Sequence, residues 1–66
     1  MRIRLNGDST ELPDGLTAAG LIEHLKMNGQ RVALEVNGEV VPRSRWLESR
    51  LTDGDQAEIV RAIGGG

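Results

Sequence analysis

The chain opens with polar and apolar residues in alternation, a pattern typical of a β-strand. Arg2 to Leu5 alternates in this way, and Asn6-Gly7 follows with two residues that tolerate positive φ. A two-residue turn at this position leads into a second strand over Ser9 to Leu12. We therefore predict a β-hairpin at the start of the chain.

The apolar spacing then changes from two residues to the period of a helix. Pro13-Asp14-Gly15 interrupts the strand pairing, and Thr17 stands where a helix N-cap is expected. Asn28-Gly29 follows with residues suited to a helix C-terminus. Between these signals four apolar residues recur at the spacing that gathers them on one helix face: Ala18, Leu21, Ile22 and Leu25. We predict an amphipathic helix of about three turns.

Strand patterns return after the helix. Val32 to Val36 alternates, Asn37-Gly38 predicts a second hairpin turn, and Glu39 to Val41 runs to Pro42, which cannot donate to a strand ladder. The segment from Arg43 to Leu51 is expected to be irregular, or to form a short helical turn around Trp46. Asp53-Gly54-Asp55 then turns the chain into a last strand, Gln56 to Ile63.

The predicted element order, β-β-α-β-β-β, favours one α+β architecture. A single helix must bury its apolar face against one side of a sheet, and the last strand can lie parallel to the first in the centre of that sheet. We therefore predict a β-grasp, or ubiquitin-like roll, in which a mixed sheet of about five strands packs on one main helix. The domain spans residues 1–63, and residues 64–66 form a C-terminal tail. The expected core is Ile3, Leu5, Leu12, Ala18, Leu21, Ile22, Leu25, Val32, Leu34, Val36, Leu51, Ala57 and Ile59.

The length and composition of the chain limit the functions that it could have. A chain of 66 residues forms one domain and has no room for a deep catalytic cleft. It contains no cysteine, which rules out a disulfide framework, a thiolate zinc site and a thiol of its own that could carry sulfur. The net charge of −2 argues against nucleic acid as a partner. With no long apolar stretch we expect no membrane association, a cytoplasmic location and a monomer when the protein is free.

The C-terminal residues Gly64-Gly65-Gly66 are the strongest candidate for chemistry. Residues without Cβ can thread a narrow channel, so the terminal carboxylate of Gly66 is a candidate reactive group. A tolerant chain end is the alternative, because disorder concentrates at termini. Ordering three glycines in a channel costs backbone entropy, so the tail alone should bind weakly. We therefore expect a second surface of the domain to contribute to binding. If Ala57 and Ile59 face the helix, the opposite sheet face carries Glu58, Val60 and Ala62, although an incidental surface valine explains Val60 equally well.

Other polar or aromatic residues are better explained by structure than by function. His24 is expected at the edge of the helix, exposed to solvent and without a partner for catalysis. Trp46 is expected to pack beneath its loop rather than to form a binding platform. The arginines at 43, 45 and 50 are expected on a solvated face, and the Asp53-Gly54-Asp55 sequence is explained by a turn, so we predict no metal site.

Several of these features together resemble the ThiS family, the sulfur carrier proteins of thiamin biosynthesis. The resemblance covers the full length and rests on the β-grasp pattern, the Gly65-Gly66 end, and the segments 37–46 and 51–60. Within those segments Asn37, Val41, Pro42, Arg43, Trp46 and the Asp53-Gly54-Asp55 turn lie where the family pattern places them. Gly64 is a small departure, because other members carry a different small residue there.

The resemblance implies a function in which the chain is a protein co-substrate rather than an enzyme. An E1-like (ThiF-like) adenylating enzyme uses ATP and magnesium to convert the Gly66 carboxylate to an acyl adenylate. A sulfur donor, ultimately a cysteine persulfide, then displaces AMP and leaves a thiocarboxylate. Thiazole synthase (ThiG-like) takes the sulfur for the thiazole ring. No cofactor is bound by the chain itself.

Two alternatives stay open from the sequence. The chain could carry sulfur for molybdopterin synthesis, although those carriers tend to be longer and the segment from Pro42 to Trp46 favours the thiamin branch. It could also be a β-grasp interaction or tagging module, whose tail is inert or joined to lysines.

Overall fold

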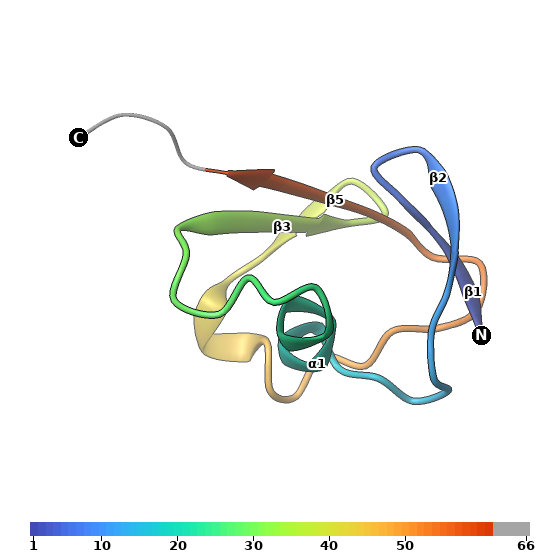
Figure 1. The fold of residues 1–66 in the computed structure, drawn as a ribbon, viewed down its shortest axis with the longest axis horizontal. Coiled ribbons are helices and arrows are strands. Elements are labelled where there is room, and N and C mark those ends of the chain that lie inside the picture. Colours follow the sequence, from blue (N-terminus) through green and yellow to red (C-terminus); the bar gives the residue numbers. More distant parts are fainter. Residues whose placement is uncertain (62–66) are drawn as a thin grey trace.

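The computed structural model of the chain describes residues 1–61. These residues form a curved sheet with the helix packed against one of its faces (Figure 1). The elements in chain order are β1 (Arg2–Leu5), β2 (Asp8–Glu11), α1 (Ala18–His24), β3 (Val32–Val36), β4 (Glu39–Val41), the 3-10 turn η1 (Arg43–Arg45) and β5 (Gln56–Arg61).

Both hairpins form at the predicted Asn-Gly pairs. Asn6 and Asn37 have φ of 51° and 53°, and the glycines that follow them have φ of 88° and 84°. Positive φ at both central residues is the geometry of the turn whose twist matches two antiparallel strands. The second strand begins one residue earlier than predicted, because the turn pairs Leu5 directly with Asp8.

The sheet has the order β2-β1-β5-β3-β4, which places the last strand in the centre. β1 and β5 are parallel, whereas β5 is antiparallel to β3, and each hairpin supplies one edge of the sheet. This mixed five-stranded sheet with a single α-helix on one face confirms the predicted β-grasp. β5 ends at Arg61; the predicted strand residues 62 and 63 lie outside the described part of the chain.

The helix begins as predicted and ends earlier than predicted. The side chain of Thr17 accepts a hydrogen bond from the Gly20 amide at 3.0 Å, which is an N-cap contact. The predicted helix length of about three turns was wrong, since α1 has only 7 residues. Lys26 adopts φ of 59°, and its amide and that of Met27 donate to the carbonyls of Glu23 and Ile22. This pattern satisfies the last helical carbonyls and ends the helix before Asn28-Gly29 is reached.

The core lies between α1 and the inner face of the sheet. Nine predicted core residues are buried, while four, Leu5, Leu25, Val32 and Val36, are half-buried and pack against the cluster. Trp46 is a core residue that the prediction left out, and its side chain is 7% exposed. The amides of Ala18 and Ala19 donate to the carbonyls of Ser49 and Trp46. These bonds hold the segment after η1 against the start of the helix, which carries Trp46 into the core. Within residues 1–61 no helix is long and apolar enough to cross a membrane.

Candidate functional site

The strand that leads to the C-terminal residues, β5, is paired on both of its edges. β5 pairs with β1 on one side, and with β3 along five consecutive residue pairs on the other. The predicted reactive residues Gly64, Gly65 and Gly66, and the predicted docking residue Ala62, lie outside the described residues. The structure does describe β5, the strand that precedes them.

The outer face of β5 is arranged as strand parity predicted. Ala57 and Ile59 are 1% and 9% exposed and face the helix, whereas Val60 is 58% exposed on the opposite face of the sheet. Glu58 is also exposed. The predicted orientation of Glu58 and Val60 is therefore confirmed, and their role in docking stays a prediction.

Strands β3 and β4 extend this outer face. Val60 lies opposite Ala33 of β3, and Glu58 lies opposite Glu35, which in turn lies opposite Val40 of β4. Val40 is 66% exposed, so this face carries a second exposed valine besides Val60. We call the five residues Ala33, Glu35, Val40, Glu58 and Val60 the outer-face patch. The sequence alone did not identify Ala33, Glu35 and Val40 as members of this face. The Asn37-Gly38 turn indicates that Glu35 pairs with Val40, but no local signal in the sequence gives the register of β3 with β5.

The turn residue Asn6 fastens β5 from the other side. Its backbone amide donates to the carbonyl of Ala57 at 2.9 Å. Its side-chain Oδ1 accepts from the Ile59 amide at 2.8 Å, and Nδ2 lies 3.4 Å from the Ile59 carbonyl oxygen. The side chain thus continues the pairing of β5 beyond the last residue of β1. Asn6 therefore holds β5 at Ile59, two residues before the end of the strand.

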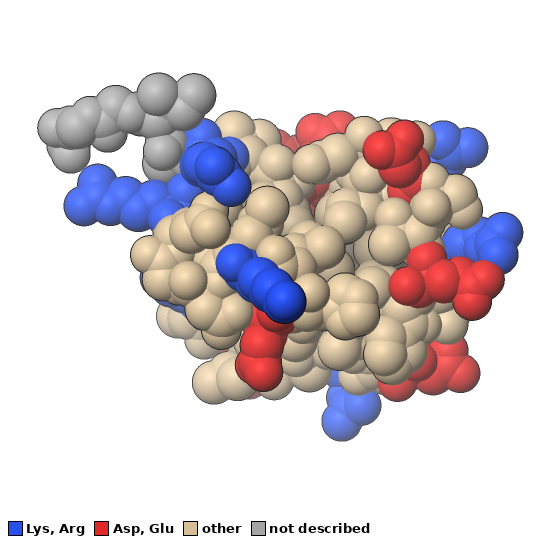
Figure 2. Space-filling view, in the orientation of Figure 1, with Lys and Arg blue, Asp and Glu red and all other residues tan. Residues whose placement is uncertain are grey.

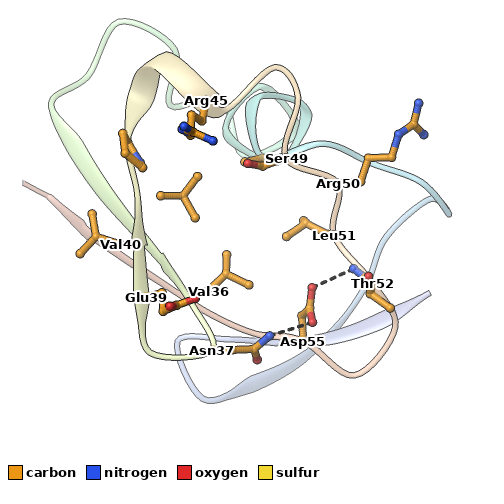
Figure 3. Close-up of a pocket in the computed structure, with 13 residues that line it drawn as sticks. Val36, Asn37, Glu39, Val40, Arg45, Ser49, Arg50, Leu51, Thr52 and Asp55 are labelled. Atoms are coloured by element: carbon orange, nitrogen blue, oxygen red, sulfur yellow. Dashed lines mark hydrogen bonds between the residues drawn. The ribbon is translucent and has the colours of Figure 1, made fainter.

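A groove of about 460 Å³ lies between the β3–β4 hairpin and the loop after η1 (Figure 3). Val36 and Leu51 point into it, whereas Arg50 extends away from it. At one end, Asp55 accepts hydrogen bonds from Asn37 Nδ2 at 3.0 Å and from the Thr52 amide at 2.8 Å. Asp55 therefore joins two turns.

One end of the groove, at Val36, lies far from the end of β5. Val36, which lines it, is opposite Ala57 near the start of the strand, whereas Arg61 at the end is opposite Val32. Four residues of extended strand span about 13 Å. The position of Val36 along the sheet is therefore about 13 Å from that of Arg61.

The other residues considered as functional candidates are either exposed to solvent or make contacts within the fold. His24 is exposed. Trp46 donates from Nε1 to the Val41 carbonyl at 2.8 Å, and the Arg43 guanidinium lies 5.0 Å from its ring centroid, a cation–π contact. Asp53 accepts a hydrogen bond from the Arg2 amide at 2.7 Å. Among residues 1–61 no three His, Asp or Glu side chains are grouped to hold a metal ion.

Charge is unevenly distributed over the surface. On the face shown in Figure 2, basic side chains gather near the end of β5, while acidic and basic side chains are mixed at the opposite end.

The ion pairs within the described residues are Arg2–Glu11 and the Met1 ammonium with Asp14, both with N–O distances of 2.6 Å. The hydrogen bond with Asp14 raises the pKa of the Met1 ammonium, and the same bond lowers the pKa of Asp14.

Comparison with known proteins identifies the family. The sequence model of the ThiS family matches residues 3–66. The chain belongs to the ThiS family. A sulfur carrier protein ThiS of Escherichia coli is 33% identical over 66 residues, which are the full length of both chains.

Other ThiS relatives agree in structure and in sequence. The crystal structure of a thiamine biosynthesis protein (ThiS) from Geobacter metallireducens superposes with a TM-score of 0.87 at 30% identity and covers all of both chains. A protein of Paramagnetospirillum magneticum called thiazole synthase is 36% identical over 66 residues, which are all of this chain and 20% of that protein. The chain thus spans about a fifth of the length of that relative and of a second thiazole synthase, from Magnetococcus marinus.

Proposed function

We propose that the chain is a sulfur carrier for the formation of the thiazole ring in thiamin biosynthesis. It acts as a protein co-substrate: its C-terminal Gly66 is adenylated, converted to a thiocarboxylate and presented to thiazole synthase. The observation that carries this proposal is the full-length match to the ThiS family, including the E. coli sulfur carrier protein. The relatives called thiazole synthase, in which a ThiS-like stretch forms part of a longer protein, support the choice of the thiazole pathway.

The chemistry requires a partner because a carboxylate is a poor electrophile. Its charge is shared by two oxygens and it has no good leaving group. Attack of the Gly66 carboxylate on ATP, with magnesium, forms an acyl adenylate and releases pyrophosphate. The outer sulfur of a cysteine persulfide then displaces AMP, and reduction of the resulting acyl disulfide by a thiol leaves the thiocarboxylate. The adenylating enzyme binds the nucleotide and metal, so the carrier supplies only a carboxylate and a docking surface.

The structure supports this division of labour through the position of β5. A central strand held by both neighbours gives the C-terminal residues a rigid base, while its outer face leaves Val60 exposed for contact with a partner. Binding energy from such a face can offset the entropy lost when glycines are ordered in a channel. We propose that the partners dock on this face while Gly64, Gly65 and Gly66 enter their active sites.

The test is the conversion of Gly66 itself. The chain is incubated with the ThiF-like adenylating enzyme of its own organism, ATP, magnesium and a persulfide donor, and the intact mass is measured. We expect a mass increase equal to the replacement of one oxygen by sulfur, located at Gly66 by fragmentation. A variant with one residue added after Gly66 should not be converted, because its carboxylate is displaced by about 3.5 Å.

A stability control makes this result specific. The extended variant should melt at the same temperature as the parent, which shows that loss of conversion does not come from unfolding. Conversion of the extended variant at the parental rate, or sulfur on a residue other than Gly66, would contradict the proposal.

A further inference from the structure

The register of the central strands places two like charges directly opposite each other. Glu35 of β3 is the cross-strand partner of Glu58 of β5, and both belong to the outer-face patch. Residues opposite one another in antiparallel strands have Cβ atoms about 5 Å apart, and like charges in that position destabilise a sheet. In natural proteins, local conflicts of this kind are expected mainly at functional or strained sites.

The chain itself does not neutralise this pair within residues 1–61. The ion pairs there involve Glu11 and Asp14, and neither Glu35 nor Glu58 takes part in one. Arg4 lies on the same face, because its cross-strand partner is Gln56, two residues before Glu58. Its guanidinium instead donates to the carbonyl of Gly7 at 3.1 Å.

Apolar side chains flank the two carboxylates. Val40 continues the row of Glu35 and Glu58 toward the edge of the sheet, and Val60 lies two residues beyond Glu58 on the same face. These valines are 66% and 58% exposed. A charged pair beside apolar area is suited to a long basic side chain, whose methylene groups cover the valines while its cationic group reaches the carboxylates.

We propose that Glu35 and Glu58 form one acidic recognition site for an arginine or lysine on the surface of the adenylating enzyme. The inference rests on the proposed function, since it names the chemistry by which that partner recognises the carrier. It adds Glu35 and Val40 to the docking surface and assigns a purpose to the like-charge pair. The repulsion present in the free carrier is relieved when the partner's cation enters.

The proposal predicts opposite effects on stability and on affinity. In Glu35→Gln and Glu58→Gln the repulsion is removed, so the free protein should melt about 2 to 4 °C higher. Binding to the adenylating enzyme should weaken about tenfold or more, because the partner's cation loses a carboxylate in the interface. A residue needed only for the fold would not produce this combination.

The experiment measures both quantities with a matched control. Binding is followed by calorimetry with the purified enzyme, without nucleotide and with EDTA present, so that no metal ion bridges the carboxylates. Glu39→Gln is the control: it removes the same charge from the same hairpin, and Glu39 lies opposite Val36, on the other face from Glu35. It should bind like the parent. The parental affinity should fall as salt rises, and that of the double variant Glu35→Gln/Glu58→Gln should fall less steeply.

The outcomes separate this inference from the carrier function. Weaker binding of both variants with unchanged binding of Glu39→Gln supports the acidic site. Equal affinity of all the variants overturns it, as does a lower melting temperature of the glutamine variants, and either result is compatible with conversion of Gly66 to a thiocarboxylate. A parent chain that binds the enzyme through this site and is never converted would count against the carrier function alone.

Discussion

Replacement of Asn6 tests whether one turn residue holds the strand that precedes the C-terminus. The Asn6 side chain accepts a hydrogen bond from the half-buried Ile59 amide, and its backbone has φ of 51°. Three variants separate these contributions. Asp keeps the acceptor oxygen and tolerates this backbone conformation, Gly keeps only the conformational freedom, and Ala loses the side-chain bonds and is strained at positive φ.

The expected losses follow from the contacts. Asn6→Asp loses the Nδ2 contact of 3.4 Å, which is worth less than about 1 kcal/mol. Asn6→Gly leaves the Ile59 amide without its acceptor, at a cost of about 1 to 2 kcal/mol. Asn6→Ala adds about 1 to 2 kcal/mol of backbone strain. A domain of 66 residues has a total stability of about 3 to 10 kcal/mol, so the Asp and Gly variants should remain folded in water, and the Ala variant should show the largest loss.

Urea denaturation gives the free energy of unfolding, and hydrogen exchange reports on the Ile59 amide itself. We expect stability in the order Asn, Asp, Gly, Ala, with faster exchange at Ile59 in the Gly and Ala variants. If Ala were as stable as Gly, strain at φ of 51° would be unimportant. If the Gly variant matched the parent in stability and in exchange at Ile59, Asn6 would not hold β5.

Two further predictions concern the surface. Val60→Asp should weaken binding to the adenylating enzyme or thiazole synthase, because the new charge is desolvated in the interface, and should leave the melting temperature unchanged; unaltered binding in calorimetry would make Val60 an incidental surface residue. The pair between the Met1 ammonium and Asp14 should make stability depend on pH at both extremes. The raised pKa of the ammonium gives stability that is present below its ordinary value of 8.0 and lost as pH rises through the folded pKa. The lowered pKa of Asp14 gives stability that is present above its ordinary value of 3.8 and lost as pH falls through the folded pKa. Urea midpoints across pH should show both losses in the parent and neither in Asp14→Asn; identical pH profiles would contradict the assignment.

Local signals in the sequence were sufficient to predict the secondary-structure elements and their order. Asn6-Gly7 and Asn37-Gly38 specify their turns because few other pairs adopt positive φ at both central positions. The period-two and helical apolar spacings then determine which faces are buried, and thus the outward orientation of Glu58 and Val60. The end of the helix was predicted wrongly because Lys26, a residue with no special preference for positive φ, provides the cap that Asn28-Gly29 was expected to provide.

Contacts between distant segments were decided only by the tertiary structure. Trp46 enters the core because carbonyls of its segment accept hydrogen bonds from the start of α1, a pairing with no local pattern. The opposition of Glu35 and Glu58 depends on the register between β3 and β5, which are joined by a long connection rather than by a tight turn. A turn fixes the register of the strands that it joins, whereas the register of strands far apart in the chain is set by the packing of the whole core.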